Sequence, residues 1–278
     1  LIDHNGFRES PEWRENIASG TDLAGYLACF ENGLSFGSLT GVRGVGTFGG
    51  SEDHTAMLCC QVDRLTRFRF CPIREGESVA LPEDLSFVIG VSGVLAEKTG
   101  AARELYNAAS LRTREIVAAW NSATGAEEST IGGILAGDED TWEGLSAVVA
   151  HSPVLSARLR AFLAESEELI PAAVAALEDG DLDAFGRLAE RSQRNARDNL
   201  GNQVLETIRM QALARDLGAH AASSFGAGFG GSVWALVPTA DADGFAAAWL
   251  ERYSAEFPEA AERATTLITR PGGPAHRL

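Results

Sequence analysis

An acidic pair that follows two glycines and a serine is the first feature of this 278-residue sequence that suggests chemistry. The segment Gly49–His54 reads Gly-Gly-Ser-Glu-Asp-His, so Asp53 stands at the mouth of a glycine-rich loop. A carboxylate in that place could accept a proton from a substrate hydroxyl. The structural alternative is that Ser51 or Asp53 caps a helix that begins here. The pattern alone leaves both interpretations open.

A second glycine segment, residues 226–231, reads Gly-Ala-Gly-Phe-Gly-Gly. This segment and residues 44–49 both match G-x-G-x-x-G, but a dinucleotide-binding fold needs a strand before the glycines and a helix after them. No strand is expected before residue 44, and a strand is expected after residue 231, so we reject that fold for both. A glycine loop between two strands can point successive N–H groups at an anion. The alternative is a tight hairpin whose glycines adopt positive φ angles.

Aromatic residues offer weaker signals. Tyr106 and Asn107 lie in a helical pattern over residues 101–121, where a tyrosine is more often a core residue than a ligand contact. Four of the tryptophans are most simply explained as core residues: Trp120, Trp142, Trp234 and Trp249.

The elements that must position these residues follow from apolar periodicity and from glycine and proline. Asp22 is expected to be the N-cap of a helix over 22–32, and the glycine density of 33–50 indicates a long, shaped loop. Residues 53–60 fit a short helix or a buried strand. Strands are predicted at 64–71, 85–91, 219–223, 233–237 and 265–269. Helices are predicted at 101–121, 154–179, 181–198, 201–217 and 241–256. This order indicates an α+β architecture, with a domain boundary near Asp84.

Composition limits the function classes. Lys and Arg number 23 and Asp and Glu number 39, so the net charge is 23 − 39 = −16, which argues against a nucleic-acid binder. No apolar run reaches the roughly 18 residues of a membrane span, so no membrane partner is expected. The four cysteines do not form a disulfide scaffold, and we expect reduced, mostly buried thiols in a cytoplasmic protein: Cys29, Cys59, Cys60 and Cys71. The five scattered histidines show no zinc-site spacing.

The order of these motifs is more specific than any one of them. The segment Gly49–His54 comes first, and Ser-Gly-Val at 92–94 with Tyr-Asn at 106–107 follows. Next comes SSFGAGFGGSVWALV at 223–237, and last PGGPAHRL at 271–278. In this order, over roughly residues 22–278, the chain resembles the galactokinase branch of the GHMP small-molecule kinases.

The resemblance implies a two-domain α+β fold. Residues 1–84 would be the remainder of an N-terminal α/β domain of the ribosomal S5-like type. Residues 85–278 would form the helix-rich C-terminal domain, a ferredoxin-like α+β domain.

The resemblance also implies an activity, namely ATP-dependent phosphorylation of a monosaccharide at its anomeric hydroxyl. Asp53 would be the catalytic carboxylate, and Gly50 and Tyr106 would contact the sugar. Four glycines would shape the loop near the ATP phosphates: Gly226, Gly228, Gly230 and Gly231. Mg²⁺ would accompany ATP, and no residue is assigned as a metal ligand. Phosphoryl transfer depends mostly on positioning and charge stabilisation, so an acidic protein needs no basic patch for it.

The chain departs from the family pattern at several positions. Glu52 and His54 stand where galactokinases usually have Met and Gln, and Phe225 stands where the third motif usually has Thr. The segment between Val94 and Tyr106 is longer than expected. The family's Gly-Glu-His-x-Asp motif and Ser-rich phosphate loop would precede Leu1, so we expect weak or absent catalysis by these 278 residues alone.

Three alternatives remain open at this point. The substrate could be another sugar: arabinose, fucose, a heptose or an N-acetylhexosamine. The protein could bind sugar and ATP as a regulator without turnover. It could also act on a non-sugar such as mevalonate or homoserine. The oligomeric state cannot be inferred.

Overall fold

The computed structural model describes residues 2–96, 101–137 and 141–276. The chain divides into two compact units, and each is described by itself. Unit 1 comprises residues 1–81 together with 271–278, and unit 2 comprises 82–270. The division falls just before Asp84, where the sequence suggested a boundary. Residues 271–278 group with unit 1, whereas the range 85–278 had placed them in the second domain.

Unit 1 contains short helices and one hairpin. Its elements in chain order are η1 (Phe7–Glu9), α1 (Pro11–Asn16), α2 (Gly20–Asn32), α3 (Glu52–Cys59), β1 (Arg64–Arg69) and β2 (Arg74–Ala80). The segment 53–60, for which a helix and a strand were both open, is therefore a helix. The antiparallel partner of β1 is β2, in an acidic stretch to which the sequence pattern assigned no strand.

The ends of α2 are fixed by local chemistry. Ser19, and not Asp22 as predicted, is the N-cap; Asp22 is the third helical residue and completes a capping box with Ser19. At the other end Gly33 adopts a left-handed conformation, φ 71°, which ends the helix. These two caps place Glu31 and Asn32 in the last turn of α2, facing the segment that follows.

Unit 2 combines one sheet with many helices, as the α+β expectation requires. Its strands are β3 (Leu85–Val91), β4 (Ala221–Phe225), β5 (Ser232–Pro238) and β6 (Thr265–Thr269). Its helices are α4 (Ala101–Thr124), α5 (Ile131–Leu135), α6 (Thr141–Val149), α7 (Pro153–Leu163), α8 (Ile170–Glu178), α9 (Leu182–Asn195), α10 (Leu205–Asp216), α11 (Ala242–Glu256) and α12 (Pro258–Ala261). The helical segments η2 (Ala164–Leu169), η3 (Ala196–Leu200) and η4 (Thr239–Asp241) continue or join them. Residues 201–204 were predicted to be helical, but Gly201 has a positive φ and the helix begins only at Leu205.

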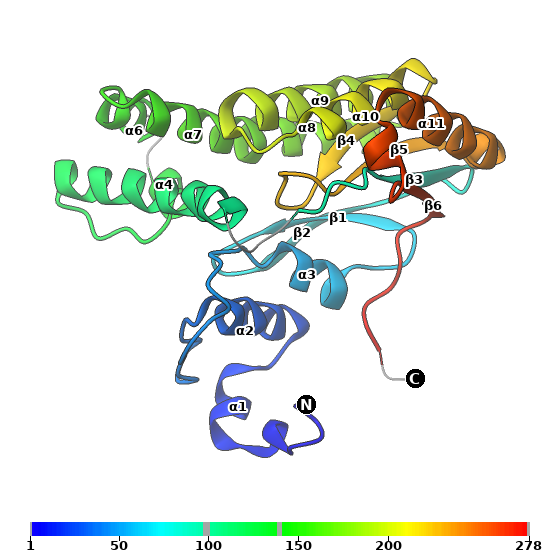
Figure 1. Ribbon diagram of the computed structural model, residues 1–278. Helices are drawn as coiled ribbons and strands as arrows, with labels where there is room; N and C mark the ends of the chain where they lie inside the picture. Colours follow the sequence, from blue (N-terminus) through cyan, green and yellow to red (C-terminus); the bar gives the residue numbers. More distant parts are fainter. Residues whose placement is uncertain (1, 97–100, 138–140, 277–278) are drawn as a thin grey trace. The chain divides into compact units, whose positions relative to one another are not determined.

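The four strands of unit 2 form an antiparallel sheet in the order β4-β5-β3-β6. Helices α10 and α11 pack against it, and Figure 1 shows both on the same side of the sheet. The core between them contains Met210, Trp249 and Tyr253, each at most 1% exposed. Gly90 on β3 makes room for this packing, because a Cβ there would lie 2.8 Å from the Trp249 ring.

A second apolar cluster joins α4, α5, α6 and α7 through residues such as Ile116, Leu145 and Leu159. Trp120 packs against this cluster, but Trp142 is 51% exposed, so its assignment to the core was wrong. Helix α4, which carries Tyr106, packs against α5, α6 and α7, and its residues in this cluster lie in its C-terminal half.

Two properties of the whole chain complete the description. Among the described residues, no helix has both the length and the apolar character needed to cross a membrane. The cysteines are free thiols, three of them partly buried and Cys71 exposed, so the expectation of mostly buried thiols was too strong. Burial raises the pKa of the Cys29, Cys59 and Cys60 thiols.

Candidate functional site

The sequence-derived site residues fall into two groups, one in each unit. Gly50 and Asp53 lie in unit 1, at the end of the long glycine segment. Tyr106 lies on α4 of unit 2, and the glycines of residues 226–231 lie in the same unit.

The glycine segment of unit 1, residues 33–50, is folded back onto the end of α2. The Val45 amide donates to the Glu31 carbonyl at 2.9 Å, and the Asn32 side-chain amide donates to the Gly49 carbonyl at 3.0 Å. The close approach of the segment to the end of α2 requires glycine at position 44, because a Cβ there would lie only 2.3 Å from the Glu31 carbonyl oxygen. These contacts fix where the loop ends, and so where α3 begins.

Asp53 lies in the first turn of α3. Ser51 occupies the N-cap position, but its side chain makes no capping hydrogen bond, and Asp53 lies inside the helix, so the alternative in which one of these side chains caps the helix is not met. The Asp53 Oδ1 atom accepts a hydrogen bond from the His54 backbone amide at 2.9 Å. The side chain remains 60% exposed. The carboxylate is thus held at one oxygen, on a side chain that is mostly exposed.

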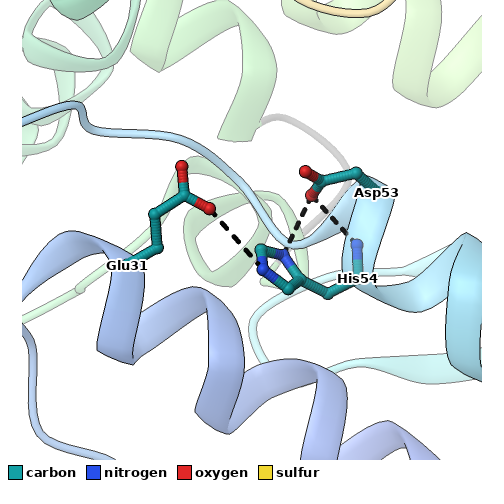
Figure 2. Close-up of side chains that lie close together, drawn as sticks. All are labelled: Glu31, Asp53 and His54. Carbon is teal, nitrogen blue, oxygen red and sulfur yellow. Dashed lines mark hydrogen bonds and ion pairs between the residues drawn. The ribbon is translucent and has the colours of Figure 1, made fainter. Parts of the chain in front are cut away.

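Three ionisable side chains of unit 1 meet at this point (Figure 2). His54 lies between two carboxylates: its Nδ1 is 2.9 Å from Asp53 Oδ1, and its Nε2 is 3.5 Å from Glu31 Oε2. The sequence analysis noted His54 and Asp53 but missed Glu31. Nothing in the sequence spacing could have shown Glu31, because α2 and α3 meet only after the glycine segment has folded back.

This cluster is also the group that could hold a cation, since one ligand atom from each residue lies within 4.8 Å of the others. However, the two carboxylates contact opposite nitrogens of the imidazole ring, as Figure 2 shows. One ion could not bind all three side chains without displacing these contacts. Close by, desolvation and, to a lesser extent, the charge of Asp53 raise the pKa of Glu52.

Gly50 borders open space. A Cβ built on Gly50 would meet no atom within 4 Å, and Gly50 is not among the residues with a positive φ. Neither steric crowding nor backbone conformation in the described structure therefore requires glycine at this position. The open space beside Gly50 would allow a ligand to approach the backbone there.

The glycine segment of unit 2 joins β4 to β5. All four of its glycines have positive φ angles, between 78° and 132°: Gly226, Gly228, Gly230 and Gly231. The segment therefore has the positive φ angles that the interpretation as a tight hairpin between two strands predicted. The Gly231 amide donates to the Val94 carbonyl at 2.9 Å, and the Phe229 amide donates to the Asn202 carbonyl at 2.6 Å. The loop is thus held against the segment after β3 and against the segment that precedes α10.

Within the described part of the chain, the amides of Ala227, Gly228 and Gly230 donate no hydrogen bond. Backbone N–H groups in a glycine loop are suitable donors for an anion such as a phosphate. Tyr106 lies on α4, partly buried, and it takes part in interactions of its own.

Comparison with known proteins bears on the fold and the family of the chain. Residues 173–255 match the family described as GHMP kinases C terminal. The galactokinase of Enterococcus faecalis is 33% identical over 126 residues, which make up 45% of this chain and 32% of that protein. The crystal structure of Lactococcus lactis galactokinase complexed with galactose superposes with a TM-score of 0.73 at 20% identity, over 96% of this chain and 63% of that one.

The structural match confirms the predicted α+β fold as that of the GHMP kinases. Together, the three matches confirm the resemblance to the galactokinase branch. The chain spans about a third of the curated relative and less than two thirds of the crystallised one.

Proposed function

From a chain with the fold of the GHMP kinases and a resemblance to their galactokinase branch, we propose ATP-dependent phosphorylation of a monosaccharide. Within that activity we propose transfer of the γ-phosphate to the anomeric hydroxyl, with galactose as the first substrate to test. The observation that carries the proposal is the placement of Asp53. It lies in the first turn of α3, directly after a glycine segment, with one carboxylate oxygen held and the side chain exposed.

Asp53 would act as the base. Its Oδ2 atom, which has no partner in the described part of the chain, would accept the proton of the sugar hydroxyl. The sugar oxygen would then form its bond to the γ-phosphorus while the bond between that phosphorus and the bridging oxygen of ADP breaks. The reaction depends mainly on positioning and on charge stabilisation, so one well-placed carboxylate is a sufficient base.

Gly50 and Tyr106 are proposed to contact the sugar. The open space beside Gly50 supports this, because a hydroxylated ring could approach the backbone there. The glycines of residues 226–231 are proposed to bind the nucleotide phosphates through the amides that donate no hydrogen bond within the described residues.

Mg²⁺ is proposed to arrive with ATP, as part of the nucleotide substrate. We assign no residue to the ion, because His54 already contacts both carboxylates of the cluster in unit 1. The two proposed domains are the S5-like domain for unit 1 and the ferredoxin-like domain for unit 2. A cytoplasmic location is part of the same proposal, supported by the free cysteines.

The test is Asp53→Asn in the full-length gene product, because the described chain covers only part of the relatives. We expect kcat to fall about 10²- to 10⁴-fold, the usual contribution of a general base, with sugar and ATP affinity nearly unchanged. Glu52→Gln is the matched control. It alters the neighbouring carboxylate and should leave kcat within a few-fold. An Asp53→Asn enzyme that keeps its rate within a few-fold would refute the catalytic assignment.

Assays of the full-length gene product also distinguish between the possible sugars and between a kinase and a regulator. A panel of galactose, arabinose, fucose, a heptose and an N-acetylhexosamine, read out as sugar phosphate and ADP, identifies the substrate. Binding of sugar and ATP without any sugar phosphate would instead indicate a regulator.

A further inference from the structure

His54 is placed so that it can control the orientation of Asp53. Its ring is only 13% exposed, whereas the Asp53 side chain that it contacts is 60% exposed. A surface aspartate is normally free to move between rotamers. Here a nearly buried ring lies beside it, and the backbone amide of His54 reaches the same carboxylate oxygen.

The contact uses one side of the carboxylate. Both dashed lines from Asp53 in Figure 2 end at Oδ1, one from the ring nitrogen Nδ1 and one from the backbone amide. Nδ1 is buried and lies 2.9 Å from Oδ1, close enough for an ion-pair contact, but the two atoms are not aligned for a hydrogen bond. Oδ1 also accepts the hydrogen bond from the backbone amide of His54. Occupation of Oδ1 leaves Oδ2 for a substrate hydroxyl.

The ring is itself held from the other side. Glu31 lies 3.5 Å from Nε2 through Oε2, and its Oε1 lies 3.5 Å from the hydroxyl of Thr47, which is 3% exposed. Glu31 therefore connects the last turn of α2 and the glycine segment to His54. The order of contacts is Thr47, Glu31, His54 and Asp53.

We propose that His54 is a positioning residue that holds the Asp53 carboxylate in its working orientation, and that Glu31 acts on Asp53 only through His54. This proposal rests on the function proposed above, in which Asp53 is the base. His54 itself touches no reacting atom. Loss of His54 should therefore reduce the fraction of correctly placed carboxylate and lower kcat, while the KM for sugar and for ATP stays nearly constant.

The variants are His54→Ala, His54→Gln and Glu31→Gln in the full-length gene product, assayed for kcat and KM. His54→Ala should lower kcat about 10- to 100-fold, the scale of loss expected from misplacing a catalytic group. His54→Gln, whose side-chain amide can contact Oδ1 in place of the ring, should recover most of that loss. Glu31→Gln should lower kcat a few-fold. His151→Ala, a change at an exposed histidine of unit 2, should have no effect.

A double-mutant comparison tests the route. If Glu31 acts through His54, adding Glu31→Gln to His54→Ala should cause no further loss of kcat. Equal losses in both backgrounds would overturn that route. Because Glu31→Gln keeps the volume and the contact with Thr47, it stays informative if His54→Ala fails to fold.

The outcomes separate the two proposals. If Asp53→Asn abolishes turnover while His54→Ala leaves kcat unchanged, or raises KM alone, the positioning role is wrong and the base assignment stands. If Asp53→Asn leaves the rate within a few-fold, the base assignment fails, and the positioning role fails with it.

Discussion

The glycine segment of unit 1, residues 33–50, ends at a polar cluster on two helices, whereas that of unit 2, residues 226–231, joins two strands of a sheet with a buried core. The first is held partly by side chains, such as the amide of Asn32 and the carboxylate of Glu31. The second is held mainly by its backbone, through positive φ angles and amide-to-carbonyl hydrogen bonds, and one side chain adds to this: the Asn202 amide donates to the Ala227 carbonyl at 3.3 Å.

The two segments also differ in the burial of the residues that hold them. The Gly231 carbonyl accepts from the Ser92 amide at 2.9 Å, and the Ser92 carbonyl accepts from the hydroxyl of Tyr253 at 2.7 Å. Tyr253 is fully buried. By contrast, the Asp53 end of the unit 1 segment is exposed.

This difference suggests a division of tasks. A loop whose shape is fixed by backbone geometry can present several N–H groups in constant positions, which suits a ligand that is the same in every turnover. A loop held by side chains can change its specificity by substitution. The nucleotide and the sugar are the corresponding ligands in the proposed function.

The largest loss of stability is expected from a substitution in the glycine segment of unit 2, residues 226–231. Gly228→Ala places a side chain at φ 81° with its Cβ 2.2 Å from the Asn202 carbonyl oxygen. Left-handed strain of about 1–2 kcal/mol adds to crowding of about 1–3 kcal/mol. We expect urea denaturation to show a loss of roughly 2–5 kcal/mol.

Gly226→Ala is the matched control for that variant. Its φ is 78°, but a Cβ there meets no atom within 4 Å. It should lose only the strain component, about 1–2 kcal/mol. Equal losses for the two variants would show that the contact with Asn202 does not constrain the loop.

The next effect is a loss of stability at alkaline pH, caused by Tyr253, which holds the same segment through Ser92. Burial, and then the charge of Glu206, raise the pKa of Tyr253 to about 12, above its ordinary value of 10.0. Between these values the folded state keeps a proton that the unfolded state releases, so stability falls as pH rises from about 10 to about 12. The total is roughly 3 kcal/mol, at about 1.4 kcal/mol for each pH unit.

Urea denaturation at a series of alkaline pH values measures this loss. Tyr253→Phe should be less stable at neutral pH by about 1 kcal/mol, because it lacks the hydrogen bond to Ser92. It should also show a smaller loss above pH 10. An unchanged slope in this variant would mean that Tyr253 is not the titrating group.

The smallest expected effect on stability lies in unit 1. Gly50→Ala meets no atom within 4 Å and needs no positive φ, so the free energy of unfolding should change by less than about 0.5 kcal/mol. If Gly50 contacts the sugar, the KM for sugar should nevertheless rise roughly 10-fold, which corresponds to about 1.4 kcal/mol of binding. Gly44→Ala is the contrasting variant. Its Cβ would lie 2.3 Å from the Glu31 carbonyl, so it should destabilise the unit. A Gly50→Ala enzyme with unchanged KM would contradict the proposed sugar contact.

Elements with a strong apolar signal were predictable from the sequence. The strand predicted at 85–91 is β3, because a run of buried apolar residues has few other solutions. The hairpin strand β2 was not predictable, since its residues from Arg74 to Glu77 are exposed and carry no alternating apolar pattern. Its structure comes from pairing with β1, which a local pattern cannot show.

The candidate site could be proposed from the sequence only where it is local. Gly50, Asp53 and His54 stand within a few residues of one another and could be named from the sequence pattern. Glu31 joins it through the fold, because α2 must end at Gly33 and the glycine segment must return to the same turn. The Ser19 cap was missed for a simpler reason: Asp22 and Ser19 take part in the same capping box, and the pattern does not say which residue is the cap.

The return of the last residues to unit 1 has a consequence for biosynthesis. The Pro271 carbonyl accepts from the Asp63 amide at 2.9 Å, and the Ala275 amide donates to the Met57 carbonyl at 2.7 Å, the latter on the helix that carries Asp53. Unit 2 is continuous in sequence and is bracketed by the two parts of unit 1. On the ribosome, where domains generally fold as they emerge, unit 2 can complete its fold before unit 1 receives its last contacts. The contact between Ala275 and the helix that bears the proposed base would then form only after unit 2 has been synthesised.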